Sequence, residues 1–174
     1  GSEMCIRDRT YEGESVYNYL QVSETDKRVV LSTNVLFGVQ SVYMKEDALT
    51  GMYYDYAMAA PLMVSGKEAK DASMLILGMG TGTYAVQCEK YFGNENIEGV
   101  EIDEKITDLS RKYFSLPESV KVTTYDGRAF LHTVDQKYDV IMVDAYQDIT
   151  IPFQMSSVEF FTLVKDHLNE DGVM

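Results

Sequence analysis

Apolar and polar residues alternate in short runs along the first part of the chain. These runs cover residues 16–22, 28–33 and 35–43, and the polar turn SETDK separates the first two. Such runs are typical of strands joined by turns. We therefore expect a small antiparallel β unit over residues 14–50. Residues 1–13 show no comparable pattern, and we interpret them as a non-native or disordered leader.

The pattern changes after residue 50. Residues 52–64 space their apolar side chains as a helix does, and Pro61 lies within that stretch, where it either kinks the helix or marks its boundary. From residue 73 onward, buried strands alternate with helices. We expect strands at 73–79, 96–103, 119–126 and 138–146, and helices at 83–92, 104–114, 127–134 and 156–168.

This alternation predicts an α/β domain over residues 51–174, with a parallel sheet and right-handed crossovers. Ser156 or Ser157 is expected to be the N-cap of the last helix, with Glu159 as its capping-box partner. The chain then reaches LNEDGVM, where a turn should lead into a new strand. We therefore expect the C-terminal strands of the sheet to be missing.

Charge and hydropathy limit the classes of partner. The 174 residues carry a formal net charge of −13. This balance argues against nucleic acid, which requires basic patches, and suits a small cationic substrate, although an acidic solvated surface accounts for it equally well. No apolar run approaches the ~20 residues of a membrane-spanning helix.

The two cysteines, Cys5 and Cys88, lie far apart in the sequence and lack the spacing of a zinc site or a disulfide framework. We therefore expect neither a zinc site nor a disulfide framework, and a reducing, cytoplasmic location.

A glycine-spaced turn follows the first strand of the α/β pattern. Gly78, Gly80, Thr81 and Gly82 lie between the apolar run and the next helix. Glycine permits a tight turn and close approach of a ligand, and the helix N-terminus offers N–H groups to it. Alone this motif is weak, because an ordinary β–α turn has the same form.

Acidic residues follow the next three strands. Glu101 ends the second strand about 20 residues after the glycines, where an acid can accept hydrogen bonds from ribose hydroxyls. We assign its neighbour Ile102 to the same cofactor site, whereas Asp103 is expected to cap a helix. The combination favours a nucleoside ligand.

The third and fourth strands end at Asp126-Gly127 and at Asp144. Asp126 can accept a hydrogen bond from an adenine amine, cap the following helix, or do both. Asp144 can accept a proton from an attacking amine or anchor a cationic substrate, or else cap the loop that follows it.

Other candidates have weaker signals. Tyr53, Tyr54 and Tyr56 cluster before the glycine turn and could form the wall of an apolar substrate slot. We expect His132 to be a surface or packing residue. His167 lies near a helix C-terminus, where interaction with the helix dipole is a sufficient role.

The order of several segments resembles the spermidine synthase-like family, the polyamine aminopropyltransferases, from about residue 14 to residue 174. The segments are SVYNYLQV, YYDYAMAAPL, LILGMGTG, GVEID, YDGRAFL and YDVIMVDAYQDITIPFQMSSVEFF. The resemblance implies a small β unit followed by a Rossmann-like domain of the methyltransferase type. It is closest to bacterial members in which this domain follows a membrane-embedded region, and it implies a homodimer.

The resemblance also implies a reaction. The family transfers an aminopropyl group from decarboxylated S-adenosylmethionine to an amine such as putrescine, releases methylthioadenosine and needs no metal. By position, Asp144 resembles the catalytic base and Glu101 the ribose-binding acid, while Asp126 and Gly127 resemble the adenine contacts. Tyr56 resembles the tyrosine of the amine slot.

The chain departs from the family pattern at the amine side of the site. Thr81 stands where the family has an aspartate that holds the donor's amino group, and Ala57 stands where a glutamine or histidine is expected. Gln147 replaces a second acid, for which Asp148 can substitute in substrate binding. Two alternatives therefore stay open: an S-adenosylmethionine-dependent methyltransferase, and a nucleoside- or polyamine-binding domain without turnover.

Overall fold

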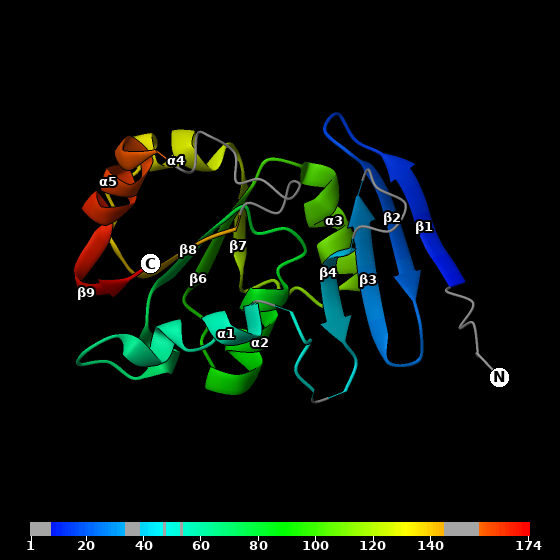
Figure 1. The fold of residues 1–174 in the computed structure, drawn as a ribbon, viewed down its shortest axis with the longest axis horizontal. Coiled ribbons are helices and arrows are strands. Elements are labelled where there is room, and N and C mark those ends of the chain that lie inside the picture. The colour runs from blue at the N-terminus through cyan, green and yellow to red at the C-terminus, as the bar shows by residue number, and fades with distance from the viewer. Residues whose placement is uncertain (1–7, 34–38, 47, 53, 145–156) are drawn as a thin grey trace. The chain divides into compact units, whose positions relative to one another are not determined.

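The structure is a computed structural model, and it describes residues 8–33, 39–46, 48–52, 54–144 and 157–174. The chain divides into two compact units, Gly1–Met52 and Tyr53–Met174. Figure 1 shows the elements of each unit.

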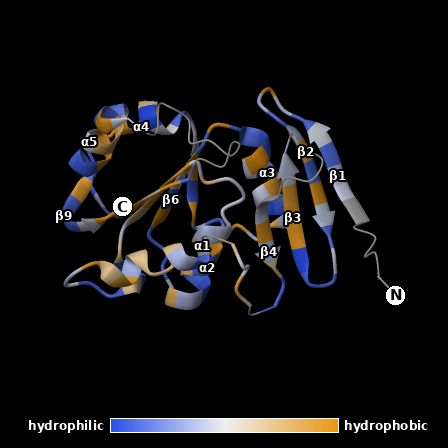
Figure 2. Cartoon of the chain, viewed as in Figure 1, coloured by the Kyte–Doolittle hydropathy of each residue, from blue (hydrophilic) through white to orange (hydrophobic). Residues whose placement is uncertain are grey.

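The first unit is a four-stranded antiparallel sheet in the order β1-β2-β3-β4. Its strands are β1 (Asp8–Glu14), β2 (Tyr19–Glu24), β3 (Arg28–Thr33) and β4 (Val39–Met44). Leu20 and Val22 on β2 and Leu31 on β3 are almost completely buried. Figure 2 shows a hydrophobic stretch on β3 and alternating hydrophobic and polar residues on β2. The predicted antiparallel unit is therefore present, with one strand more than the pattern indicated.

The additional strand corrects part of the interpretation of residues 1–13 as a non-native or disordered leader, because residues 8–13 are ordered, while residues 1–7 lie outside the described residues. Residues 8–14 form β1, which pairs with β2 from Asp8 opposite Glu24 to Glu14 opposite Tyr19. The sequence of β1, DRTYEGE, is mostly polar because β1 is the edge strand, and charged residues are common on sheet edges. The alternation of apolar and polar residues in this segment was therefore too weak to identify β1 as a strand.

The second unit contains a five-stranded parallel sheet in the order β7-β6-β5-β8-β9. Its strands are β5 (Met74–Leu77), β6 (Ile97–Glu101), β7 (Lys121–Thr124), β8 (Tyr138–Val143) and β9 (Leu168–Val173). The helices that connect them are α2 (Thr83–Phe92), α3 (Glu104–Tyr113), α4 (Gly127–Thr133) and α5 (Val158–Asp166). This is the α/β parallel-sheet fold that the alternating pattern predicted, and it is Rossmann-like, as the family resemblance implied.

Helices cover both faces of this sheet. Figure 1 shows α4 and α5 together on one side and α2 on the other. The core on the α4–α5 side contains Leu75, Leu77 and Ile141 from the strands, with Phe130 from α4 and Phe160 from α5. Successive strand residues point to opposite faces, so Met74 and Ile76 are directed toward the other layer. Both faces of β5 are buried, which explains its uninterrupted apolar sequence.

The predicted helix over residues 52–64 is wrong in extent. The structure has a short helix α1 (Tyr54–Ala57) and a separate 3₁₀ helix η1 (Ala60–Met63), in which Pro61 lies in the first turn. A second 3₁₀ helix, η2 (Ala69–Asp71), follows before β5. Proline lacks an N–H group and fits the first turn of a helix, so of the two expectations for Pro61 the boundary is confirmed.

The last helix and the last strand also differ from expectation. The hydroxyl of Ser157 accepts a hydrogen bond from the Phe160 N–H (3.1 Å), so Ser157 is the N-cap. Glu159 is then the second helical residue and not the third, which a capping box requires. The segment 168–173, interpreted as a turn, forms β9 alongside β8.

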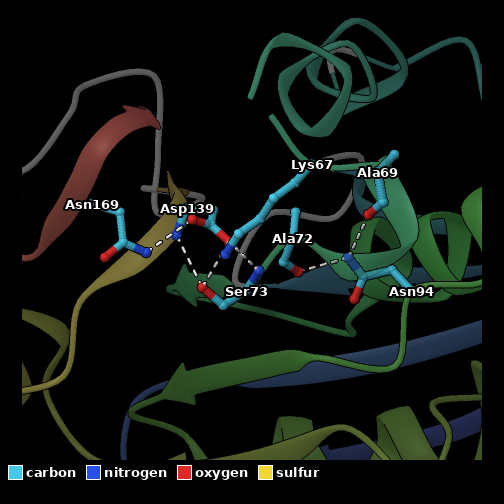
Figure 3. A network of polar contacts seen from close by, with 7 residues as sticks. All are labelled: Lys67, Ala69, Ala72, Ser73, Asn94, Asp139 and Asn169. Atoms are coloured by element: carbon cyan, nitrogen blue, oxygen red, sulfur yellow. Dashed lines mark hydrogen bonds and ion pairs between the residues drawn. The ribbon is translucent and has the colours of Figure 1, made fainter. Parts of the chain in front are cut away.

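A polar network joins the amino-terminal ends of the strands (Figure 3). Asp139 on β8 is only 3% exposed. Its carboxylate accepts hydrogen bonds from the Lys67 ammonium (2.8 Å), the Ser73 N–H (2.9 Å) and the Asn169 amide (2.8 Å). Nearby, the buried Asn94 amide donates to the carbonyls of Ala69 and Ala72, each at 2.8 Å. These contacts hold the segment before β5, and Asn169 at the start of β9, against the sheet.

Candidate functional site

The glycine turn leaves β5 at the carboxyl edge of the sheet. Gly78, Gly80 and Gly82 have φ values of 71°, 60° and 76°, a left-handed conformation that residues with a Cβ rarely adopt. The N–H groups of Gly78 and Met79 both donate to the Val100 carbonyl on β6, at 2.9 and 3.0 Å. The turn is therefore held by the neighbouring strand before α2 begins.

Glu101 lies beneath this turn. Its Oε2 accepts a hydrogen bond from the Gly80 N–H (2.7 Å), and its Oε1 accepts one from the Asp103 N–H (3.2 Å). The Glu101 side chain is 1% exposed. The structure therefore joins the predicted acid to the predicted glycine turn directly, while its contact with a ribose stays a prediction.

Thr81 faces the protein interior. It is completely buried, and its Oγ1 lies 3.1 Å from the Oγ1 of Thr83, the first residue of α2. A hydroxyl pair at this position carries no charge.

Asp126 and Gly127 follow β7, as expected. The Asp126 carboxylate accepts a hydrogen bond from the Ala129 N–H (2.9 Å) and caps α4, and its side chain is exposed. Asp103 likewise caps α3 through the Lys105 N–H (3.1 Å). Both capping roles are therefore confirmed, and the exposed Asp126 keeps lone pairs for a further donor because a carboxylate has about four such sites.

Asp144 directly follows β8. Its N–H donates to the Leu77 carbonyl (2.8 Å), which places it beside the start of the glycine turn. The strand order reverses between β5 and β8, since β6 lies on one side of β5 and β8 on the other. Ligands of open parallel sheets bind at the carboxyl ends of the strands beside such a reversal. Asp144 is half-buried there.

The remaining predicted residues are less well placed. Tyr56 on α1 is 87% exposed, so in this structure it does not form the wall of an enclosed slot. Ile102 follows β6 and is partly buried. Tyr53, Gln147 and Asp148 lie outside the described residues.

Neither histidine belongs to this group. His132 is exposed on α4, as expected. His167 is the C-cap residue of α5, and its two ring nitrogens lie 2.8 Å from the carbonyl oxygens of Leu163 and Val134. These contacts give His167 a structural role at the helix end.

Cys88 is not a nucleophile. Burial raises the pKa of its thiol to about 12, despite a smaller opposing effect of the Tyr84 hydroxyl. A thiolate is the reactive form of cysteine, so Cys88 stays neutral and unreactive at physiological pH. Within the residues that the structure describes, no group of His, Cys, Asp and Glu side chains could hold a metal ion. None of the described helices is long and apolar enough to cross a membrane.

Two contacts of the turn were missed in the sequence. The Met79 side chain, 5% exposed, packs over Gly99 in β6. The buried Ser110 hydroxyl on α3 lies 3.2 Å from the Gly80 carbonyl, while its shorter hydrogen bond goes to the Ile106 carbonyl at 2.6 Å. A glycine inside an apolar strand often marks a close approach, so Gly99 offered a signal for the first contact. Nothing in the sequence distinguished Ser110 from other helix residues.

Comparison with known proteins identifies relatives of this chain. The chain is 65% identical, over 94% of its length, to a probable polyamine aminopropyl transferase of Bifidobacterium longum. It covers 36% of that relative. It is 27% identical to the polyamine aminopropyltransferase of Alkaliphilus metalliredigens, covering 97% of this chain and 59% of the relative. The chain therefore spans between about one third and three fifths of the length of these relatives.

Solved structures share the fold. A probable spermidine synthase from Corynebacterium glutamicum superimposes with a TM-score of 0.79 at 22% identity, covering 91% of this chain and 60% of that one. A spermidine synthase in complex with the transition state analogue AdoDATO gives a TM-score of 0.71 at 21% identity, covering 95% and 55%. The spermine/spermidine synthase domain matches residues 52–174. This match covers more than half of the chain, which therefore belongs to the spermine/spermidine synthase family.

Proposed function

We propose that this chain is the nucleoside-binding and catalytic part of a polyamine aminopropyltransferase. Its donor is decarboxylated S-adenosylmethionine, its acceptor is a small cationic amine such as putrescine, and its product is methylthioadenosine. The observation that carries the proposal is the position of Asp144, whose backbone bonds to Leu77 at the strand-order reversal, beside a glycine turn held by Glu101. The named activity of the Bifidobacterium longum relative supports it.

The residues divide the work between donor and acceptor. The glycine turn gives a nucleoside close access to the backbone, and the N-terminus of α2 follows immediately. We assign the ribose to Glu101, with Ile102 beside it, and the adenine to Asp126 and Gly127. A net charge of −13 favours approach of a cationic amine.

The transfer step requires positioning and a base. The lone pair of the amine nitrogen forms a bond to the propyl carbon attached to the sulfonium. The carbon–sulfur bond breaks, and its electron pair stays on sulfur, which leaves as the thioether of methylthioadenosine. The proton released by the amine passes to Asp144. Alignment of the two reactants and proton acceptance are the main contributions that the protein makes.

The acceptor side is less complete. Tyr56 is the proposed slot residue and would have to be covered when substrate binds, because it is 87% exposed here. Asp148 is the proposed second acid. A homodimer, an attached membrane region and a cytoplasmic location for this part of the chain stay predictions.

Calorimetric binding and a transfer assay test the proposal on the full chain. We expect tighter binding of decarboxylated S-adenosylmethionine and methylthioadenosine than of S-adenosylmethionine. When the protein is incubated with decarboxylated S-adenosylmethionine and putrescine, mass spectrometry should detect spermidine and methylthioadenosine in equal amounts. Preference for the carboxylated compound, with methyl transfer to an acceptor, would identify a methyltransferase instead. Binding without any transfer would identify a binding domain.

A further inference from the structure

We propose that Met79 and Gly99 form a positioning pair that sets where the glycine turn lies on the sheet, and so controls nucleoside affinity. This inference rests on the proposed function, because it assumes that the turn binds the nucleoside. Neither residue needs to touch the ligand. Their effect would act through the backbone of Gly78, Gly80 and Gly82.

The first observation is the fit of Met79 over Gly99. A Cβ at position 99 would overlap the Met79 Sδ, and it would lie 3.2 Å from the Met79 Cγ and 3.3 Å from its Cβ. The conflict therefore reaches the near end of the Met79 side chain as well as its sulfur. Gly99 does not have a positive φ, so its backbone does not require glycine. The absence of a Cβ at position 99 thus serves the contact with Met79.

The second observation is that the Met79 backbone belongs to the turn. Its N–H donates to the Val100 carbonyl (3.0 Å), and its carbonyl accepts from the Gly82 N–H (3.1 Å). The Met79 Cε also approaches the Gly82 position, where an added Cβ would lie 3.5 Å from it and 2.6 Å from the Leu116 Cδ1. A displaced Met79 would therefore shift both ends of the turn.

The third observation is that the turn has little room to adapt. The Gly80 N–H is held by Glu101 at 2.7 Å. The Ser110 hydroxyl donates mainly to the Ile106 carbonyl at 2.6 Å and lies 3.2 Å from the Gly80 carbonyl, so it packs directly against the turn. Both partners are buried. A methyl group added at position 99 would push the Met79 side chain away from β6. Because a packed interior transmits strain, this displacement would move the turn and its contacts together.

A double-mutant cycle tests the pair. We would prepare Gly99→Ala, Met79→Ala and the double variant in the full chain. For each we would measure methylthioadenosine affinity by calorimetry and the midpoint of thermal unfolding. We expect Gly99→Ala to weaken binding roughly tenfold, the size of effect expected when about one hydrogen bond between the turn and the ligand is lost. The double variant should bind more tightly than Gly99→Ala alone, because removing the Met79 side chain gives the new methyl group space.

A matched variant separates positioning from general destabilisation. Val164→Ala opens the core beside α5, at a residue outside the turn and its hydrogen bonds, and is expected to lower the unfolding midpoint without weakening methylthioadenosine binding. If Gly99→Ala bound methylthioadenosine as tightly as the unchanged protein, this inference would be overturned while the proposed function would still stand. The inference would also be overturned if the affinity losses of Gly99→Ala and Met79→Ala simply added in the double variant. A loss of affinity in Val164→Ala comparable to that in Gly99→Ala would overturn it as well. If the unchanged protein bound no methylthioadenosine, the proposed function itself would be wrong, and the inference with it.

Discussion

The carboxylate of Glu101 accepts a hydrogen bond from the Gly80 N–H at 2.7 Å, and so joins the tip of β6 to the turn that follows β5. Two features separated by 21 residues in the sequence thereby become one structural unit. The buried acid stabilises a left-handed backbone conformation that glycine adopts far more readily than other residues. A change at Glu101 is therefore expected to affect the shape of the site as well as its charge.

Glu101→Gln is expected to lower methylthioadenosine affinity by roughly 10- to 100-fold, because hydrogen bonds to a charged group contribute about 1.5–3 kcal/mol. Calorimetry measures the affinity. Glu101→Ala should remove binding altogether and also lower the unfolding midpoint, since the Gly80 and Asp103 N–H groups lose their acceptor. Unchanged affinity in both variants would remove the ribose assignment.

Asp144→Asn should separate binding from turnover. The side chains are nearly equal in size, and the backbone bond from residue 144 to the Leu77 carbonyl does not depend on the carboxylate. We expect methylthioadenosine affinity within about twofold of the original, and kcat for spermidine formation lower by about 10²–10⁴, as is typical when a general base is lost. Turnover that persisted near its original rate would show that another group accepts the proton.

Asp126 caps α4, so its variants must distinguish that role from adenine binding. Asp126→Ser keeps a good N-cap, whereas Asp126→Ala loses it at a cost of about 1 kcal/mol in the free energy of unfolding. If Asp126 also binds adenine, both variants should lose affinity for methylthioadenosine, but only the alanine variant should lose stability. Full affinity in Asp126→Ser would leave capping as its sole role.

The parallel sheet was predictable because its signals are local and strong. The runs at β5 and β8 are uninterrupted and apolar, and glycine or acidic residues mark their ends. Because parallel strands end at one edge, the order of elements also predicted that Gly78, Glu101 and Asp144 would lie near one another. The structure confirms this for the described backbone.

The elements that were missed lack such signals. Strand β1 is stabilised by pairing with β2 and not by an apolar face of its own, and β9 carries the polar sequence LNEDGV. The exposure of Tyr56 and the burial of Thr81 depend on tertiary packing, which a short motif does not encode. Contacts between distant segments, such as those of Asp139, were likewise invisible in the sequence.

Asp139 provides a prediction about stability that is independent of the site. Burial by itself would raise its pKa, but hydrogen bonds from Lys67, Ser73 and Asn169 outweigh burial and lower the pKa from 3.8 to about 2. A group with a lowered pKa in the folded state stabilises the fold above its unfolded pKa. That contribution is lost as the pH falls through the folded value.

We therefore expect the free energy of unfolding to decrease by about 2 kcal/mol between pH 4 and pH 2 through Asp139 alone. Denaturant titrations at several pH values measure it, and Asp139→Asn supplies the comparison because it removes the titrating group. Lys67→Met keeps the aliphatic stem but loses the ammonium, so it should retain only part of the decrease, the part due to Ser73 and Asn169. Parallel pH profiles for the original protein and Asp139→Asn would contradict this assignment. The network would then stabilise the sheet by packing and neutral hydrogen bonds, with no contribution from the charge of Asp139.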